Sequence, residues 1–290
     1  MKELIKKAMN HVALAWYRAK TRSAAEPTLE RPVSQLVTVA QMRSDTYKAW
    51  CQEMKLEPRT YRKSWEFAYV LQALQDAGVL RAGSRGLGFG VGLEPVPAVL
   101  ARRGCEVVVT DLAPDRARGL GWAAMSGLDV AELNQAGICP AEEFARRVSW
   151  RSVDMNAIPT ALRRGEFDFV WSSCSLEHLG SIALGRAFVL NSLECLKPSG
   201  VAVHTTELNL TSNVFTIDRM PTVLFRKRDV VATLEACRAR GWESSFNACA
   251  GRDPLDRRFD LPPYVGSLHL KLLIGRYVST SVGFLLRRSG

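Results

Sequence analysis

Four glycines at alternate positions give the sharpest chemical signal in the sequence. They lie in the run Gly86-Leu-Gly88-Phe-Gly90-Val-Gly92, which follows a short apolar segment and precedes a predicted helix over residues 97–103. Glycines let the backbone turn tightly and let a ligand approach without a Cβ in the way. A dinucleotide-binding loop needs the spacing G-x-G-x-x-G, but Val91 and Leu93 stand where its last glycine would fall. The loop therefore favours a cofactor that has no pyrophosphate.

Acidic residues close the next two predicted strands. Asp111 lies 19 residues after Gly92, and a carboxylate there can accept hydrogen bonds from both hydroxyls of a ribose. Asp154 can accept from an adenine amino group, and Met155 can pack on the ring, although both can also belong to an ordinary turn. Because ligands of open α/β sheets bind at the carboxyl ends of the strands, we expect one site to hold these groups.

Two further side chains can handle a proton. His178 follows another predicted strand and titrates near neutral pH, so it can act as a base, cap the next helix or close a pocket. Glu207 ends a predicted strand, where it can orient a hydroxyl, act as a base or cap a loop. With Asn209 it can also contribute to a Mg²⁺ site. The four histidines show no H-x-x-x-H spacing, and we predict no resident metal.

Strand-like and helix-like segments alternate from Gly83 onward. Predicted strands cover residues 84–89, 105–111, 148–153, 167–173, 201–206, 242–247 and 280–286. Helices are predicted between them, including one from Asp115 to Met125. This alternation implies a mostly parallel sheet with helices on both faces, so we predict an α/β, doubly wound domain over residues 81–290.

Residues 1–80 are expected to form an N-terminal helical cap on the substrate side. The segment from Met1 to about Ala25 is a basic amphipathic helix, which can pack on the body or contact a membrane surface or a partner. Residues 33–74 are mostly helical and rich in aromatic side chains, and Trp65 is a candidate substrate contact.

A second covering segment is expected near the C-terminus. Residues of about 250–275 contain Pro262 and Pro263, which stiffen the chain. We expect a lid here, in which Tyr264 and His269 can touch an acceptor; ordinary loop packing is the alternative.

Composition narrows the class of protein. The chain has 290 residues, of which 47% are hydrophobic and 23% charged, as in globular domains. Its seven cysteines form no C-x-x-C pair, so we predict neither a disulfide scaffold nor a zinc ribbon, and a reducing cytoplasm as the compartment. We find no apolar run of about 18 residues and expect no membrane span or secretory signal. The net charge of +10 leaves nucleic acid, an acidic membrane surface or an anionic substrate open.

Over residues 83–207 the chain resembles the class I S-adenosylmethionine-dependent methyltransferases. The resemblance rests on Gly88-Phe-Gly-Val-Gly92, Asp111, Asp154-Met155, the run Phe167-Asp-Phe-Val-Trp-Ser-Ser-Cys-Ser-Leu-Glu-His178 and the turn Leu193-Glu-Cys-Leu-Lys-Pro-Ser-Gly200. It implies a Rossmann-like, seven-stranded mixed sheet with one antiparallel strand, and S-adenosylmethionine as cofactor. The cofactor contacts that it implies are Gly88, Phe89, Gly90, Gly92, Glu94, Asp111, Leu112, Asp154, Met155, Ser173 and Cys174.

One position departs from the family pattern. Many members carry an acidic residue two positions before the first loop glycine, where it holds the methionine amino group; here that position is Gly86. Glu94, just after the loop, is the candidate substitute.

The resemblance implies methyl transfer to an acceptor. The polar set His178, Glu207, Asn209 and His269 favours O-methylation of a small hydroxylated molecule such as a sugar, a glycan precursor or a secondary metabolite. An RNA or protein methyltransferase and a non-catalytic S-adenosylmethionine-binding protein are the alternatives. Nucleic acid is not expected as a partner, because basic residues are spread among acids and no RNA-binding module is evident. A homodimer stays open.

Overall fold

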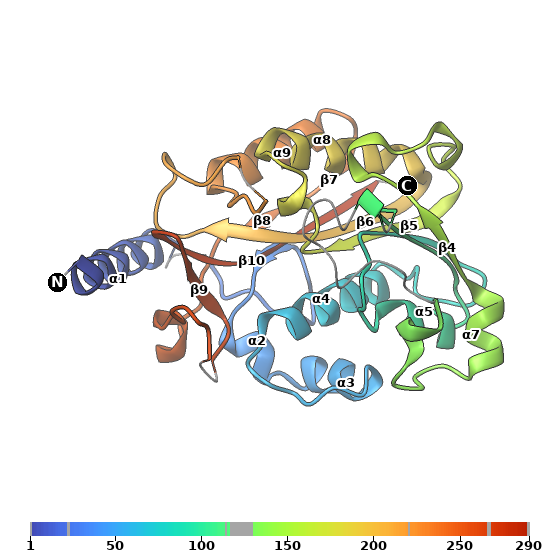
Figure 1. Ribbon diagram of the computed structural model, residues 1–290, viewed down its shortest axis with the longest axis horizontal. Helices are drawn as coiled ribbons and strands as arrows, with labels where there is room; N and C mark the ends of the chain where they lie inside the picture. The colour runs from blue at the N-terminus through green and yellow to red at the C-terminus, as the bar shows by residue number, and fades with distance from the viewer. Residues whose placement is uncertain are drawn as a thin grey trace.

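One mixed β-sheet runs through the molecule (Figure 1). The computed structural model describes residues 2–21, 24–113, 115–116, 130–219, 221–265 and 268–288. Its strands are β1 (Ser34–Leu36), β2 (Arg85–Phe89), β3 (Glu106–Asp111), β4 (Val148–Ser152), β5 (Phe167–Ser173), β6 (Leu196–Asn209), β7 (Trp242–Glu243), β8 (Phe246–Asn247), β9 (Lys271–Ile274) and β10 (Tyr277–Arg288). They follow the order β4-β3-β2-β5-β6-β10-β1-β8, and β7 and β9 also pair with β10.

The centre of the sheet is parallel and doubly wound. Strands β4, β3, β2, β5 and β6 pair in parallel, and β10 runs antiparallel to β6 from Ser279 opposite Asn209 to Arg287 opposite Val201. The chain moves outward from β2 to β3 and β4, and then returns to place β5 on the other side of β2. The loops after β2 and β5 therefore diverge at the carboxyl edge, where such sheets bind ligands. The predicted α/β doubly wound fold is confirmed.

The strand number differs from the prediction. Within the described residues the sheet has ten strands, not seven. The predicted strand over residues 242–247 divides into β7, which pairs with β10, and β8, which pairs with β1. Strands β1 and β9 were not predicted. These pieces have two to four residues each, too few to show a period of two, and their partners lie far away in the sequence.

Helices cover both faces of the sheet (Figure 1). Helices α8 and α9 lie on one face, and α2, α3, α4, α5 and α7 lie on the other. Their bounds are α2 (Val39–Arg43), α3 (Asp45–Glu53), α4 (Arg62–Asp76), α5 (Val96–Arg102), α7 (Ala141–Arg147), α8 (Ile182–Ser192) and α9 (Lys227–Arg238). A separate hydrophobic core fills the space on each side of the sheet. Of the helix predicted from Asp115 to Met125, residues 117–125 lie outside the described part of the chain.

The N-terminal segment is built into the sheet. Strand β1 pairs with β10, and α4 packs across the same strand, with Tyr69 over Gly283. A Cβ at Gly283 would lie 2.2 Å from the Tyr69 ring, so glycine is what lets the ring lie so close. The Tyr69 hydroxyl donates to the carbonyl of Val33 at 2.8 Å, which fixes the entry into β1. The helices predicted as a cap thus share a core with the rest of the described chain.

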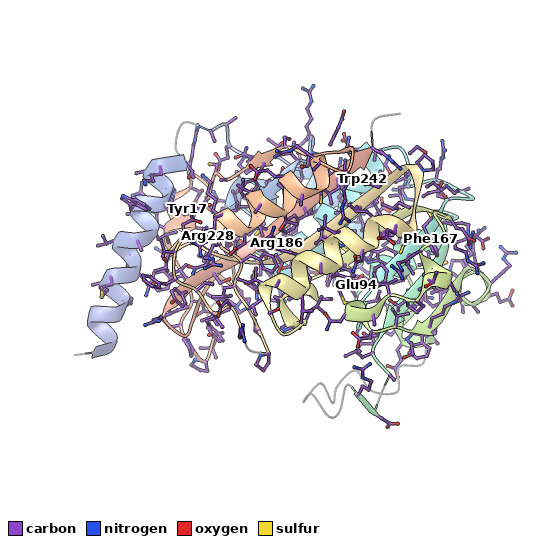
Figure 2. The ribbon with its side chains drawn as sticks, turned by 90° about the horizontal axis from the view of Figure 1, so that it is seen from above. Tyr17, Glu94, Phe167, Arg186, Arg228 and Trp242 are labelled. Carbon is purple, nitrogen blue, oxygen red and sulfur yellow. The ribbon has the colours of Figure 1, made fainter. Side chains whose placement is uncertain are left out.

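Helix α1 (Lys2–Thr21) lies at one end of the molecule (Figures 1 and 2). Tyr17 is directed toward the body in Figure 2, and both Leu14 and Tyr17 are buried. The Thr211 hydroxyl donates to Asn10 Oδ1 at 2.7 Å and joins the helix to the loop after β6. None of the described helices is both long and apolar enough to span a membrane. All seven cysteines are buried and none forms a disulfide.

His204 gives the fold a defined sensitivity to acid. It is fully buried in β6, between the hydroxyls of Ser172 (2.9 Å from Nδ1) and Ser192 (3.1 Å from Nε2). Burial lowers its pKa to about 3, so the ring stays neutral in the folded protein while the unfolded chain protonates near 6.5. Stability is therefore lost as the pH falls from 6.5 toward 3, by up to about 1.4 kcal/mol per pH unit.

We predict that His204→Gln reduces the loss of folding stability between pH 6.5 and pH 3. Urea unfolding at a series of pH values measures it, with His11→Gln, at an exposed position, as the matched control. The control should keep the wild-type slope. An unchanged slope in His204→Gln would contradict the assignment, whatever that variant loses in stability at neutral pH.

Candidate active site

A cavity of about 470 Å³ opens at the carboxyl ends of β2, β3 and β5. Its size is that of a small-molecule site. Nine of the eleven predicted cofactor contacts lie in its wall: Gly90, Gly92, Glu94, Asp111, Leu112, Asp154, Met155, Ser173 and Cys174. His178 lines it as well. The wall also contains residues that were not predicted, namely Lys63, Phe67, Val91, Leu93, Arg116, Val153, Asn156, Ser175 and Leu179.

The glycine loop forms one wall of the cavity. Gly90 and Gly92 have φ angles of +58° and +52°, a region that side chains rarely adopt. A Cβ at Gly90 would lie 2.7 Å from the side chain of Ser175 and 3.2 Å from the sulfur of Met155. The Ser175 hydroxyl donates to the carbonyl of Gly90 at 2.8 Å and holds the loop against the end of β5. Glycine is therefore required here by both conformation and space.

Gly88 and Phe89 do not line the cavity. Successive side chains of a strand point to opposite faces, and these two residues still belong to β2. Phe89 packs edge-on against Phe188, 5.2 Å away, in the core on the side of α8. A Cβ at Gly88 would lie 2.4 Å from the Trp171 ring. Both residues thus shape the strand that carries the loop.

Glu94 is a buried carboxyl group in the cavity wall. The Trp171 indole donates to its Oε1 at 2.5 Å, and burial raises its pKa to about 8. A side chain at Gly86 would meet the Phe169 ring at 2.2 Å, so an acidic residue does not fit at that position. The glycines of β2 make room for the rings of Phe169 and Trp171, and Trp171 in turn orients Glu94.

Two further carboxylates, Asp111 and Asp154, lie in the cavity wall at the ends of β3 and β4. Asp111 accepts from the backbone N–H of Gly92 at 3.0 Å and of Leu112 at 2.7 Å. Burial raises its pKa, and these two N–H groups work against that rise. Asp154 pairs with Arg116 at 2.9 Å and accepts from the N–H of Asn156 at 2.9 Å. Both side chains are held by neighbours and still face the cavity.

Helix α4 supplies a further wall. Lys63 and Phe67, four residues apart on one side of the helix, line the cavity. Trp65 lies in the hydrophobic core instead, where it stacks on Tyr69 and donates to Gln41 Oε1 at 2.9 Å. The spacing of Lys63 and Phe67 could have indicated that both lie on this wall. The sequence analysis instead predicted Trp65, the aromatic residue between them, as a substrate contact.

Glu207 lies beneath α4 and does not line the cavity. It is buried, forms an ion pair with Arg62 and accepts a hydrogen bond from Ser279. Burial alone would raise its pKa, but Arg62, together with Ser279 and Lys63, holds the pKa of Glu207 below its usual value. Arg62 also donates to the Ser281 hydroxyl at 3.2 Å. The carboxylate is therefore ionised and anchors α4 to β6 and β10.

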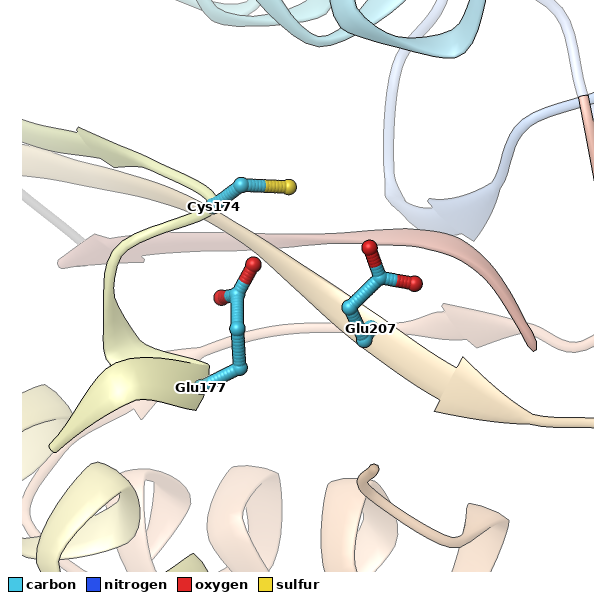
Figure 3. Close-up of side chains that lie close together, drawn as sticks. All are labelled: Cys174, Glu177 and Glu207. Carbon is cyan, nitrogen blue, oxygen red and sulfur yellow. The ribbon is translucent and has the colours of Figure 1, made fainter. Parts of the chain in front are cut away.

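Cys174 of the cavity wall approaches two carboxyl groups that do not line the cavity, Glu177 and Glu207 (Figure 3). One ligand atom of each lies within 4.8 Å of the others. Burial raises the pKa of the Cys174 thiol and of Glu177, and the Thr206 hydroxyl donates to Glu177 at 3.0 Å. The cations of Arg62 and Lys63 act on the same carboxylates. The side chains of Arg62 and Lys63 thus supply positive charge beside the two carboxyl groups of the cluster.

The hydrogen bond of His178 to the backbone defines which of its two ring nitrogens carries the proton. Its Nδ1 lies 2.7 Å from the carbonyl oxygen of Pro221, which can only accept, so we assign the proton to Nδ1. In the neutral ring Nε2 then carries the lone pair, 3.9 Å from Glu177 Oε1. This is the tautomer that can take a proton at Nε2.

The other predicted acceptor contacts lie outside the cavity. Asn209 organises its own loop: it donates to the carbonyl of Phe215 at 3.0 Å and accepts from Thr211 N–H at 2.8 Å. Tyr264 donates to the carbonyl of Leu273 at 2.8 Å. The carbonyl of His269 accepts from the N–H of Arg62 at 3.1 Å, at the start of α4. Of the predicted lid, residues 266–267 fall outside the described part.

The cavity thus joins a glycine loop, two carboxylates at strand ends and a buried carboxyl group. Several solved structures that are similar to this chain are described as methyltransferases. Magnesium protoporphyrin IX methyltransferase from Synechocystis PCC 6803, which has S-adenosylhomocysteine bound, is 13% identical over 100% of both chains, with a TM-score of 0.44. A SAM-dependent methyltransferase from Aquifex aeolicus is 15% identical over 74% of this chain and 88% of its own, with a TM-score of 0.40.

A further similar structure is described with a different activity. The [4+2]-cyclase SpnF is 20% identical over 61% of this chain, with a TM-score of 0.44, and the match spans 58% of the cyclase. No family model and no curated protein matches the sequence.

The raised pKa of Glu94 makes stability depend on pH in a testable way. The folded protein keeps this proton up to about pH 8, whereas the unfolded chain releases it near 4.5. Stability therefore falls as the pH rises from 4.5 to 8, by up to about 1.4 kcal/mol per pH unit. We predict that Glu94→Gln removes this fall and is increasingly stabilised relative to wild type over the same range.

Chemical unfolding at several pH values measures the effect. Glu57→Gln, at an exposed position, is the matched control and should track the wild type. Parallel wild-type and Glu94→Gln curves would show that Glu94 is ionised in the fold.

Proposed function

We propose that this protein is an S-adenosylmethionine-dependent methyltransferase that acts on a small hydroxylated acceptor, such as a sugar, a glycan precursor or a secondary metabolite. One observation carries the proposal. Nine residues chosen from the sequence as cofactor contacts, from segments up to 84 positions apart, line a single cavity. An accidental glycine-rich turn would not bring Asp111, Asp154 and Glu94 to the same space.

The residues present fit the cofactor. Asp111, Asp154 and Met155 line the cavity. In the proposal Asp111 accepts from the ribose hydroxyls, and Asp154 and Met155 hold the adenine. At the other end Glu94 offers a carboxyl group for the methionine amino group. The Ser173 hydroxyl lies beside Glu94 in the same cavity wall, where it can also donate to a polar group of the cofactor.

S-adenosylmethionine, when bound, supplies an electrophilic methyl group on its sulfonium. The chain must then align an acceptor with that methyl group and exclude water. In the proposal, Lys63 and Phe67 of α4 close the acceptor side, and His178 Nε2 takes the proton of an acceptor hydroxyl. Glu207 acts indirectly, as the partner of Arg62 that holds α4 in place. We also propose a cytoplasmic location, which the buried, unpaired cysteines support.

Asp111 is the sharpest test of the cofactor assignment. We predict that Asp111→Ala weakens binding of S-adenosylmethionine by at least about tenfold, because hydrogen bonds to a carboxylate contribute about 1.5–3 kcal/mol each. Titration calorimetry measures it. Asp45→Ala, which removes a fully exposed carboxylate on α3, should bind like the wild type. Equal affinity of Asp111→Ala and wild type would sink the assignment.

His178 tests the acceptor class. We predict that His178→Gln lowers turnover of a hydroxylated acceptor by about 10²–10⁴-fold while cofactor affinity is kept, because the proton has lost its acceptor group. Transfer of a labelled methyl group to a panel of hydroxylated small molecules measures turnover. The residual rate of the variant should rise with pH as the hydroxyl itself ionises. Full activity in His178→Gln, with a wild-type pH profile, would exclude the base role.

A further inference from the structure

Helix α1 exposes an apolar stripe that nothing in the described structure covers. Met9, Val12 and Trp16 are 67%, 70% and 58% exposed. They recur at intervals of three and four residues and so lie along one side of the helix. The other side, with Leu14 and Tyr17, is the one that packs on the body. One apolar face of the helix therefore packs on the body, and the second is exposed and available for an interaction partner.

Basic residues accompany this stripe. The first 22 residues contain six lysines and arginines and a single acid, Glu3. The ammonium group of Lys20 lies 3.6 Å from the centroid of the Trp16 ring. Exposed apolar side chains flanked by cations are typical of helices that lie in a lipid–water interface.

A basic cavity of about 510 Å³ lies between α1 and the segment 249–257. Four of its lining residues, His11, Arg18, Arg252 and Arg257, carry or can carry positive charge. Arg18 Nε donates to the carbonyl of Gly251 at 3.0 Å and fixes one edge. Burial is the main effect that lowers the pKa of Arg18, and the charge of Arg257 adds to it against the opposing effect of Asp256. Because Arg18 and Arg257 line the same cavity, an anion bound there can meet both guanidinium groups.

The cavity and the stripe lie on adjoining sides of α1. A helix turns by about 100° per residue, which places Ala15 and Ala19 between Trp16 on one side and Arg18 on the other. Ala15 and Ala19 also line the cavity. Small side chains thus separate the apolar stripe from the basic cavity, so a single surface can reach both.

We propose that α1 docks on the surface of a membrane that contains anionic lipids, with Met9, Val12 and Trp16 in the interface and a lipid phosphate in the cavity at Arg18 and Arg257. The apolar stripe then contacts the lipid interface, and the basic side chains contact the anionic head groups of the same membrane. The proposal is independent of the chemistry of the active site.

Other occupants fit less well. A symmetric contact with a second copy would place the same basic residues of two chains against each other, and three exposed apolar residues are few for the roughly 800 Å² that each partner of a stable interface buries. Nucleic acid would match the positive charge, but it would leave Met9 and Val12 in water.

Co-sedimentation of the full-length protein with lipid vesicles tests the proposal. We expect binding to vesicles of phosphatidylcholine mixed with phosphatidylglycerol, at least tenfold weaker binding to phosphatidylcholine alone, and loss of binding in Val12→Glu/Trp16→Glu. The matched control is Trp150→Glu/Leu184→Glu, since Trp150 of β4 and Leu184 of α8 are 39% and 41% exposed on other elements. It should bind like the wild type.

A second pair of variants tests the cavity. Arg257→Glu should weaken binding to the anionic vesicles by at least about fivefold, the contribution of one basic side chain near such a surface. Arg81→Glu, at another exposed position, should change it much less. Circular dichroism and urea unfolding show that the variants are folded.

Three outcomes would overturn the proposal. The first is absence of wild-type binding to anionic vesicles at low salt. The second is equal binding by Val12→Glu/Trp16→Glu and its control. The third is a dimer in light scattering, or an RNA complex in a gel-shift assay, that Val12→Glu/Trp16→Glu abolishes while vesicles are not bound.

Discussion

The buried ion pair between Arg62 and Glu207 is the interaction on which the active site depends. It joins the first turn of α4 to the end of β6, and the serines of β10 complete it. A buried charge that loses its partner destabilises a fold by several kcal/mol, because its desolvation is no longer offset. The pair therefore keeps α4, with Lys63 and Phe67, in one place over the cavity. Glu207 itself does not line the cavity.

A second constraint comes from the missing side chains of β2. Gly86 and Gly88 leave room for two large rings of β5, and the indole of Trp171 then holds Glu94 in the cavity wall. An acidic side chain at position 86 would occupy the space of the Phe169 ring. The buried carboxyl group therefore lies after the glycine loop, at Glu94, because the aromatic rings of β5 fill the space beside Gly86.

The parts of the site that lie at strand ends could be predicted from the sequence, because strand, turn and carboxylate follow one another within a few residues. This holds for Gly90, Asp111, Asp154 and Cys174, and for the parallel strands that carry them. Contacts between distant segments could not. Arg62 and Glu207 are 145 positions apart, β1 and β8 are too short to show a period, and the choice of Trp65 over Lys63 required knowing which side of α4 faces the core.

The place of β1 has a consequence for how the chain is made. Its partner in the sheet is β10, whose Val282 and Gly283 lie almost 250 residues later. During synthesis β1 emerges early, and its antiparallel partner is missing until β10 has left the ribosome. Contacts of such long sequence separation form slowly and leave hydrophobic surface open in the meantime. The nascent chain is therefore most vulnerable to misassociation just before its synthesis reaches the last strand.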